Sequence, residues 1–142
     1  MFWLTRVRSH SMAPTLPDGS LALTRRLWRS TPVRRGDLVI VDPPERGGLM
    51  VKRVIGLPGE TVTIKAGEVR IDGRALVEPY ARPSVFTGTY RVPPDHYFLL
   101  GDNRDASSDS RVWHNPCIPR EALLGRLLGV RWTRQRQGLT HS

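Results

Sequence analysis

The chain has little cysteine, little lysine and no long apolar segment. Among its 142 residues Cys117 is the only cysteine, so neither an internal disulfide bond nor a metal cage built on cysteine can form. No apolar run approaches the roughly 20 residues that a membrane-spanning helix requires. These absences exclude a disulfide scaffold, a cysteine-ligated zinc module and a transmembrane helix within this sequence.

The scarcity of lysine is selective. Of the 22 basic residues two are lysines, Lys52 and Lys65, and the other 20 are arginines. Lys52 lies inside the apolar run 49–55. Arginine stays protonated in proteins, whereas a buried lysine can lose its proton and act as a base. Taken alone, a lysine that snorkels to the surface is the simpler explanation, so the neighbouring motifs must decide.

The charge balance favours an anionic partner. The net charge is +9 and the sequence pI is about 11.1, which fits phospholipid or nucleic acid and does not choose between them. The arginines are scattered from Arg6 to Arg136, so an ordinary solvated surface explains the charge equally well. With 25% charged and 39% apolar residues, the composition is that of a folded chain, and the length suits one domain.

Short apolar runs between turn residues predict a mainly β fold. The pair Asp72-Gly73 predicts a two-residue hairpin turn, and Pro119 followed by Glu121 predicts one short helix around 119–124. Strands are expected at 20–24, 37–41, 49–55, 61–65, 68–71, 96–100 and 126–132. The expected organisation is a membrane-proximal segment 1–8, one domain 9–132 with a small lobe inserted at about 60–94, and a polar basic tail 133–142.

Ser11 is a candidate nucleophile that needs a base, because a serine hydroxyl is unreactive until a neighbour takes its proton. His10 adjoins Ser11, and in an extended segment the two side chains point apart. His96 and His114 stay open as bases. The chain has no Gly-x-Ser-x-Gly pattern, so a nucleophile elbow of that kind has no support.

Lysine is the alternative base. In an extended 49–55 strand the side chains of Met50, Lys52 and Val54 share one face, which places the lysine between two apolar neighbours. Desolvation there disfavours the charged ammonium and lowers the pKa of the amine. A neutral Lys52 could then accept the proton of Ser11 if the fold brings the two together.

The segment 101–111 is the most polar stretch of the chain. Asp109 and Arg111 can pair and hold a loop beside the lysine strand, and the hydroxyl of Ser107 can orient the lysine amine. The alternative is a solvated turn rich in aspartate and asparagine.

At these three segments the chain resembles the type I signal peptidase family, which works by a serine–lysine dyad. The similar motifs stand in the family's order: Ser11-Met12-x-Pro14-Thr15; Lys52-Arg53-Val54-Ile55-Gly56-Leu57-Pro58-Gly59-Glu60; the hairpin 69–80; Gly101-Asp102-Asn103-Arg104-x-x-Ser107-x-Asp109-Ser110-Arg111; and Leu124-Gly125-Arg126.

The resemblance implies a role for each matching residue. Ser11 would be the nucleophile and Lys52 the general base. The hydroxyl of Ser9 would stabilise the oxyanion together with the amide of Ser11. The supporting residues would be Ser107, which orients the lysine, and the salt-bridged pair of Asp109 and Arg111.

The resemblance also implies a compact β fold and a reaction that uses no cofactor and no metal. The substrates would be exported preproteins, cleaved after small residues in an Ala-x-Ala pattern. The enzyme would be membrane-associated, with its catalytic domain on the extracytoplasmic face. The expected partners are therefore preproteins and an anionic membrane surface, and not nucleic acid.

Three departures from the family pattern stand out. His10 occupies the position between the two serines where many members have glycine. The family is usually anchored by transmembrane segments before the nucleophile, and ten residues precede Ser11 in this sequence. A shortened chain and attachment by surface residues are the alternatives. The stretch 59–101 is short, so the family's second lobe is expected to be little more than a hairpin.

Four other functions compete with a general signal peptidase. A maturation protease dedicated to one substrate would use the same dyad. A self-cleaving repressor would also use it, but the sequence has no helix-turn-helix before the serine. A basic nucleic-acid-binding β-barrel would explain the charge, although the tryptophans do not gather on one strand. An inactive relative used for binding would not need the complete set of Ser11, Lys52, Ser107, Asp109 and Arg111.

Overall fold

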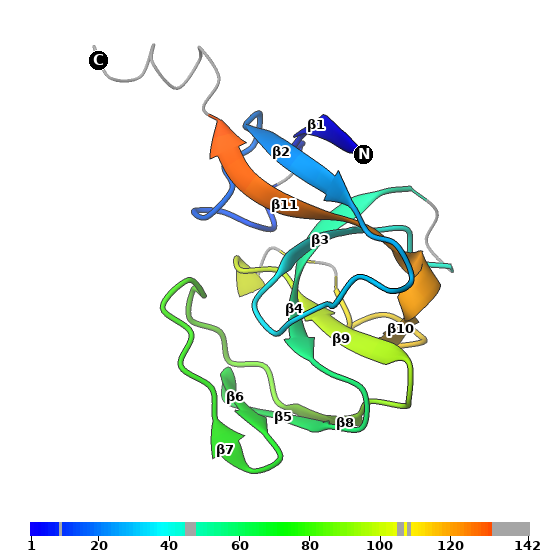
Figure 1. The fold of residues 1–142 in the computed structure, drawn as a ribbon. Coiled ribbons are helices and arrows are strands. Elements are labelled where there is room, and N and C mark those ends of the chain that lie inside the picture. The colour runs from blue at the N-terminus through cyan, green and yellow to red at the C-terminus, as the bar shows by residue number, and fades with distance from the viewer. Residues whose placement is uncertain (9, 45–47, 105–106, 108, 132–142) are drawn as a thin grey trace, which may run out of the picture.

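The structure, a computed structural model, describes residues 1–8, 10–44, 48–104, 107 and 109–131. Within them the chain forms two antiparallel sheets (Figure 1). The seven-stranded sheet has the order β1-β2-β11-β3-β4-β9-β10 and the four-stranded sheet has the order β7-β6-β5-β8. In chain order the strands are β1 (Phe2–Arg6), β2 (Leu21–Arg26), β3 (Leu38–Val41), β4 (Met50–Gly56), β5 (Thr61–Lys65), β6 (Glu68–Ile71), β7 (Arg74–Ala75), β8 (Gly88–Arg91), β9 (His96–Leu100), β10 (Cys117–Pro119) and β11 (Leu123–Arg131).

The predicted mainly β class is confirmed. Strands β5, β6 and β9 have the predicted bounds, and β2, β3, β4 and β11 overlap their predictions. The short strands β1, β8 and β10 were not predicted as strands. The helix expected around 119–124 is a 3₁₀ helix, η2 (Arg120–Ala122), because its flanking residues Pro119 and Leu123 are extended. Residue 132 and the tail 133–142 lie outside the described residues.

Two tight turns shape the small sheet. Asp72 and Gly73 have φ angles of 51° and 87° and join β6 to β7, which confirms the predicted hairpin, since such turns require positive φ at both central residues. Ala66 and Gly67 repeat the geometry between β5 and β6, with φ angles of 49° and 84°. Alanine rarely adopts this conformation, so the sequence gave no sign of the second turn.

A shared apolar core joins the two sheets. Ile55, Phe98 and Leu100 from the large sheet pack against a cluster from the other side made of Val62, Ile64, Val69, Ile71 and Val92. Gly56 ends β4 at the closest approach, where a Cβ would lie 2.6 Å from Val62 Cγ2. The segment 60–94, expected as an inserted lobe, thus contributes a sheet of its own that is packed on β4 and β9. The division of the chain into segments 1–8, 9–132 and 133–142 stays a prediction.

A membrane-spanning element is not found in the structure, since none of the helices in the described part of the chain is long and apolar enough to cross a bilayer.

Candidate active site

Ser11 lies in the turn that follows β1. Met12 and Leu16 are 1% and 0% exposed and pack with Val7 in a small apolar cluster. The amide of Leu16 donates to the carbonyl of Met12 at 2.8 Å. These buried neighbours anchor the turn on the sheet, so Ser11 is held 6% exposed at its start.

Lys52 projects from β4, which lies between β3 and β9 in the large sheet. It is 3% exposed. Its Nζ atom donates hydrogen bonds to Ser11 Oγ and to Ser107 Oγ, both at 3.1 Å. The amine therefore does not snorkel to the surface. The fold brings together a buried hydroxyl and a buried amine that are 41 residues apart in the chain.

Asp109 holds Ser107 in place beside the lysine. Ser107 Oγ donates to Asp109 Oδ2 at 2.8 Å, and the amide of Gly101 donates to the same oxygen at 3.0 Å. Arg111 Nε donates to Asp109 Oδ1 at 2.8 Å and its Nη2 donates to Oδ2 at 3.0 Å. With Asp109 0% exposed, this loop is not a solvated turn. Its charges are paired inside the protein.

Gly101 is a site residue that sequence reasoning noted only as part of a motif. A Cβ at this position would lie 2.1 Å from Ser107 Oγ and 2.7 Å from the carbonyl oxygen of Ser11. No side chain fits there without displacing one of these groups. The spacing of the motif gave no sign of this close approach.

Asp102 is a second buried carboxylate, which the sequence analysis did not single out. It is 0% exposed and accepts hydrogen bonds from Arg53 Nε at 2.9 Å, Arg53 Nη2 at 2.7 Å and Thr15 Oγ1 at 2.6 Å. The guanidinium of Arg53 also lies 3.8 Å from the ring centroid of Tyr80. Burial raises the pKa of the Tyr80 hydroxyl, with the neighbouring Glu78 as a further cause. Asp102 thus ties the turn after Ser11 to β4.

Asn103 fixes the backbone on either side of the nucleophile. Its amide donates to the carbonyl of Ser11 at 2.8 Å, and its Nδ2 donates to the carbonyl of His10 at 3.0 Å. The side chain of His10 is exposed. The backbone carbonyls of the turn are therefore held by the same loop that carries Ser107.

A cavity of about 680 Å³ opens beside Ser11 and Lys52. Side chains from β1, β3 and β4 line it, among them Leu4, Ile40 and Met50. The dyad therefore faces a space with largely apolar walls, large enough for several residues of an extended peptide.

Comparison with known proteins places the chain in a family. The family profile described as "Signal peptidase, peptidase S26" matches residues 1–132. The chain belongs to the signal peptidase family. Signal peptidase I of Leptolyngbya laminosa is 36% identical over 143 residues, which cover 93% of this chain and 70% of the relative. For the probable signal peptidase I-2 of Synechocystis sp. the identity is 37% over 142 residues, covering 94% and 64%.

A solved structure in the signal peptidase family has the same fold. The crystal structure of a signal peptidase I from Enterococcus faecalis matches with a TM-score of 0.60 and 29% identity, over 70% of this chain and 98% of that chain. These findings confirm the predicted family, its β fold and the enzyme class, a hydrolase acting as a serine endopeptidase. The chain spans about two thirds of the length of the relatives from Leptolyngbya and Synechocystis.

The candidate residues of this signal peptidase family member meet at one place, with one exception. Ser11, Lys52, Ser107, Asp109 and Arg111 are joined by the hydrogen bonds given above. Ser9 lies outside the described residues, so its role at the oxyanion stays a prediction, as do the roles of the others.

The histidines considered as alternative bases lie elsewhere or are exposed. His96 Nδ1 contacts the carbonyl of Pro94 at 2.8 Å and lines a separate cavity of about 440 Å³ that also holds Cys117. Burial raises the pKa of the Cys117 thiol to about 11, which keeps it protonated at neutral pH. His114 is exposed. The basic group in contact with Ser11 Oγ is the amine of Lys52.

Proposed function

We propose that this chain removes signal peptides from exported preproteins, with Ser11 as nucleophile and neutral Lys52 as general base. The observation that carries the proposal is the 3.1 Å contact between Lys52 Nζ and Ser11 Oγ in a site where both residues are more than nine-tenths buried. Burial disfavours a charged ammonium, and a neutral amine can take a proton at the pH at which the enzyme works.

The reaction then runs in two halves. In the neutral form of the site the hydroxyl of Ser11 becomes the donor and Lys52 Nζ the acceptor. The amine takes this proton while Oγ attacks the scissile carbonyl carbon, and the carbonyl electron pair moves to the oxygen. The ammonium next protonates the leaving nitrogen as the C–N bond breaks, which leaves an ester on Ser11. The amine then deprotonates a water molecule, whose attack on the ester releases the signal peptide.

Two groups are proposed to stabilise the oxyanion, the amide of Ser11 and the hydroxyl of Ser9. A donor of this kind typically contributes about 2.7–4 kcal/mol to the transition state. Asn103 supports the assignment indirectly, because its bonds to the carbonyls of Ser11 and His10 fix the orientation of the peptide groups in the turn.

The proposed cleavage site is an Ala-x-Ala pattern. The cavity beside the dyad has largely apolar walls, which suits short apolar side chains. The proposal of a general substrate class, rather than one dedicated substrate, rests on the family motifs and not on the shape of the cavity.

The proposed second partner is an anionic membrane surface, reached on the extracytoplasmic face. The edge strand β1 alternates so that Phe2, Leu4 and Arg6 share an exposed face, and Leu4 also lines the cavity beside the dyad. A basic residue near anionic lipid contributes about 1 kcal/mol. Binding to phosphatidylglycerol vesicles should weaken in Leu4→Ser and not in Val77→Ser, whose side chain is 84% exposed elsewhere. Binding to duplex DNA in place of the vesicles would favour the nucleic-acid alternative.

The test of the proposed function is cleavage of a preprotein carrying an Ala-x-Ala site, in detergent, mapped by mass spectrometry. Wild type should cut once, after the second alanine, and Ser11→Ala and Lys52→Arg should not cut. The chain offers a matched control in Lys65→Arg, because Lys65 is exposed and is the only other lysine. Near-normal cleavage by Lys52→Arg would refute the lysine base. No cleavage by the wild type would refute the substrate assignment.

A further inference from the structure

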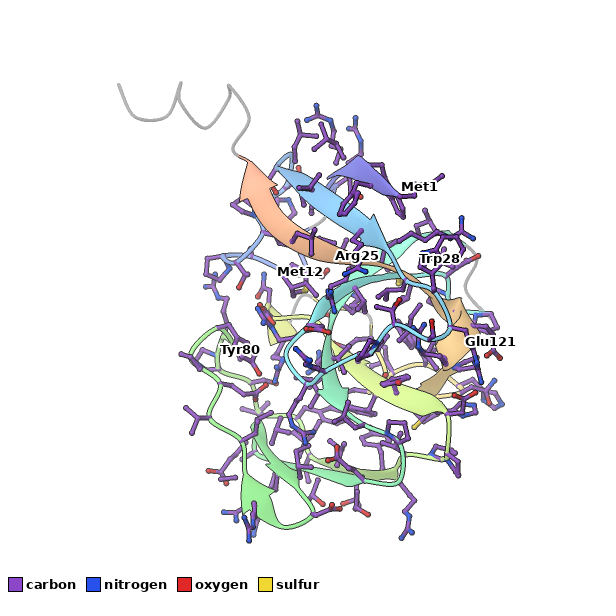
Figure 2. All side chains as sticks on the ribbon, in the orientation of Figure 1. Met1, Met12, Arg25, Trp28, Tyr80 and Glu121 are labelled. Carbon is purple, nitrogen blue, oxygen red and sulfur yellow. The ribbon has the colours of Figure 1, made fainter. Side chains whose placement is uncertain are left out.

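A connection from the small sheet reaches the loop that holds the lysine. Residues 76–87 join β7 to β8, leave the small sheet and run up beside the large one (Figure 1). Tyr80 is labelled on this connection in Figure 2. The amide of Arg82 donates to the carbonyl of Asp102 at 3.0 Å. The connection is therefore bonded to the same 101–111 loop that contains Ser107.

An ion pair forms the firmest part of this link. Arg104 donates to Glu78 through Nη2 at 2.6 Å and through Nη1 at 3.2 Å. The two side chains are 3% and 9% exposed. The hydroxyl of Tyr80 donates to the same carboxylate at 3.0 Å. Glu78 is thus fixed from two sides, and its partner is fully enclosed in the protein.

Arg104 also grips the loop at two points. Its Nε donates to the carbonyl of Gly101 at 2.6 Å, and its own carbonyl accepts a hydrogen bond from Arg111 Nη2. Gly101 is the residue that leaves no spare room beside Ser107. Arg111 is the partner of Asp109, which holds the Ser107 hydroxyl. Arg104 therefore contacts both groups that define where Ser107 lies.

A small shift of Arg104 would be felt at the amine. Gly101 and Asp109 bracket Ser107, so a displacement of the loop changes the 3.1 Å contact between Ser107 Oγ and Lys52 Nζ. A misplacement of about 1 Å at a reacting group can cost roughly 100-fold in rate. The carboxylate that fixes the position of Arg104 comes from the small sheet's connection and does not touch the dyad.

We propose that Glu78 is a positioning residue for the catalytic amine, acting through Arg104 and the 101–111 loop. This inference rests on the proposed function and adds a residue and a route to it. It also gives the small sheet a role in the reaction, since the connection that carries Glu78 begins and ends in that sheet. The alternative is a buried ion pair that contributes to stability only.

Steady-state kinetics on an Ala-x-Ala peptide form the first arm of the test. Glu78→Ala should lower kcat about 10- to 100-fold with KM changed less than twofold, because the substrate cavity contains none of these residues. Glu78→Gln should recover part of the loss, because its amide oxygen can still accept a bond from Arg104. Glu68→Ala is the matched control, since Glu68 pairs with Arg70 in the same small sheet but is 56% exposed. It should leave both constants unchanged.

The second arm needs no substrate. With lysine labelled with ¹³C at Cε, the protein gives two side-chain signals, from Lys52 and Lys65, because these are its only lysines. The titration midpoint of Lys52 should move in Glu78→Ala, move less in Glu78→Gln and stay in place in Glu68→Ala. If the wild type cleaves no Ala-x-Ala peptide, the proposed function fails, yet this arm still tests the positioning. A loss of thermal stability in both Glu78 variants, with kcat and the Lys52 signal unchanged, would assign the pair to stability and overturn the proposal.

Discussion

Two buried aspartates in one loop serve the site in different ways. Asp102 and Asp109 are both 0% exposed, and each is paired with an arginine through two or more hydrogen bonds. Asp109 also accepts the hydroxyl of Ser107, whose oxygen contacts the amine of Lys52. Asp102 instead accepts the hydroxyl of Thr15 and is not in contact with the amine through any of these bonds.

The comparison separates positioning of a reacting group from assembly of the segments that carry it. Each carboxylate is neutralised by its arginine, so neither leaves an uncompensated charge in the core. The Asp109 network ends on an atom that must be correctly placed during the reaction. The Asp102 network joins the nucleophile turn to β4, which places the elements without touching the dyad. Loss of Asp109 should therefore appear in kcat, and loss of Asp102 in stability.

The largest effect is expected where the Asp109 network is most crowded. Gly101→Ala should lower the cleavage rate at least about 100-fold, because the new Cβ would lie 2.1 Å from Ser107 Oγ and must displace it from the lysine. The measurement is kcat on an Ala-x-Ala peptide together with the thermal midpoint. Gly129→Ala is the control, because a Cβ there meets nothing within 4 Å. Equal rates for the two variants would show that the position of Ser107 is not critical.

A pair of asparagine variants tests the comparison directly. Asp109→Asn should lower kcat by one to two orders of magnitude, since the geometry around Ser107 is lost. Asp102→Asn should leave kcat within a few-fold of wild type and lower the free energy of unfolding by about 3–5 kcal/mol, the usual cost of breaking a buried ion pair. Urea unfolding and steady-state kinetics on both variants give the answer. The opposite pattern, with activity lost only in Asp102→Asn, would reverse the two assignments.

The pH dependence tests whether the Asp109 network serves a neutral amine. Burial of Lys52 disfavours its ammonium form, so its titration midpoint is expected below the usual lysine value of about 10.4. The rate should rise with pH through this midpoint, because only the neutral amine can take the proton of Ser11. The ascending limb of kcat/KM is compared with the ¹³C titration of Lys52, with Lys65 as internal reference. A limb that follows a histidine, and moves only in a His96 or His114 variant, would contradict the lysine base.

The sequence predicted the strand that carries Lys52 because the apolar residues of 49–55 follow a strand pattern. It could not show that Ser11 meets Lys52, because contacts across 41 residues depend on how β3, β4 and β9 pair. That meeting was expected only from the family resemblance. Gly101, Asp102 and Glu78 were missed as site residues, because their importance lies in close approaches between loops. The strands β1, β8 and β10 were missed because they are short, and β10 contains a proline.

A partly exposed carboxylate gives the smallest expected effect and sets the lower end of the comparison. Glu60 accepts two hydrogen bonds from Arg35, at 2.7 and 2.8 Å, and one from the amide of Leu57. The Arg35 hydrogen bond is the main cause that lowers the pKa of Glu60. Its contribution to stability is therefore present above the unfolded-state pKa of about 4.3 and is lost as the pH falls through the lower folded-state pKa.

Glu60→Gln should thus destabilise the protein by about 1 kcal/mol or less at pH 7, as is usual for pairs that water reaches. The difference from wild type should shrink as the pH falls below about 4. Urea unfolding of both proteins at pH 7 and at acidic pH measures it. A difference as large as that of Asp102→Asn would mean that enclosure is not what separates the two pairs, and the strength of the Asp102 link would need another cause.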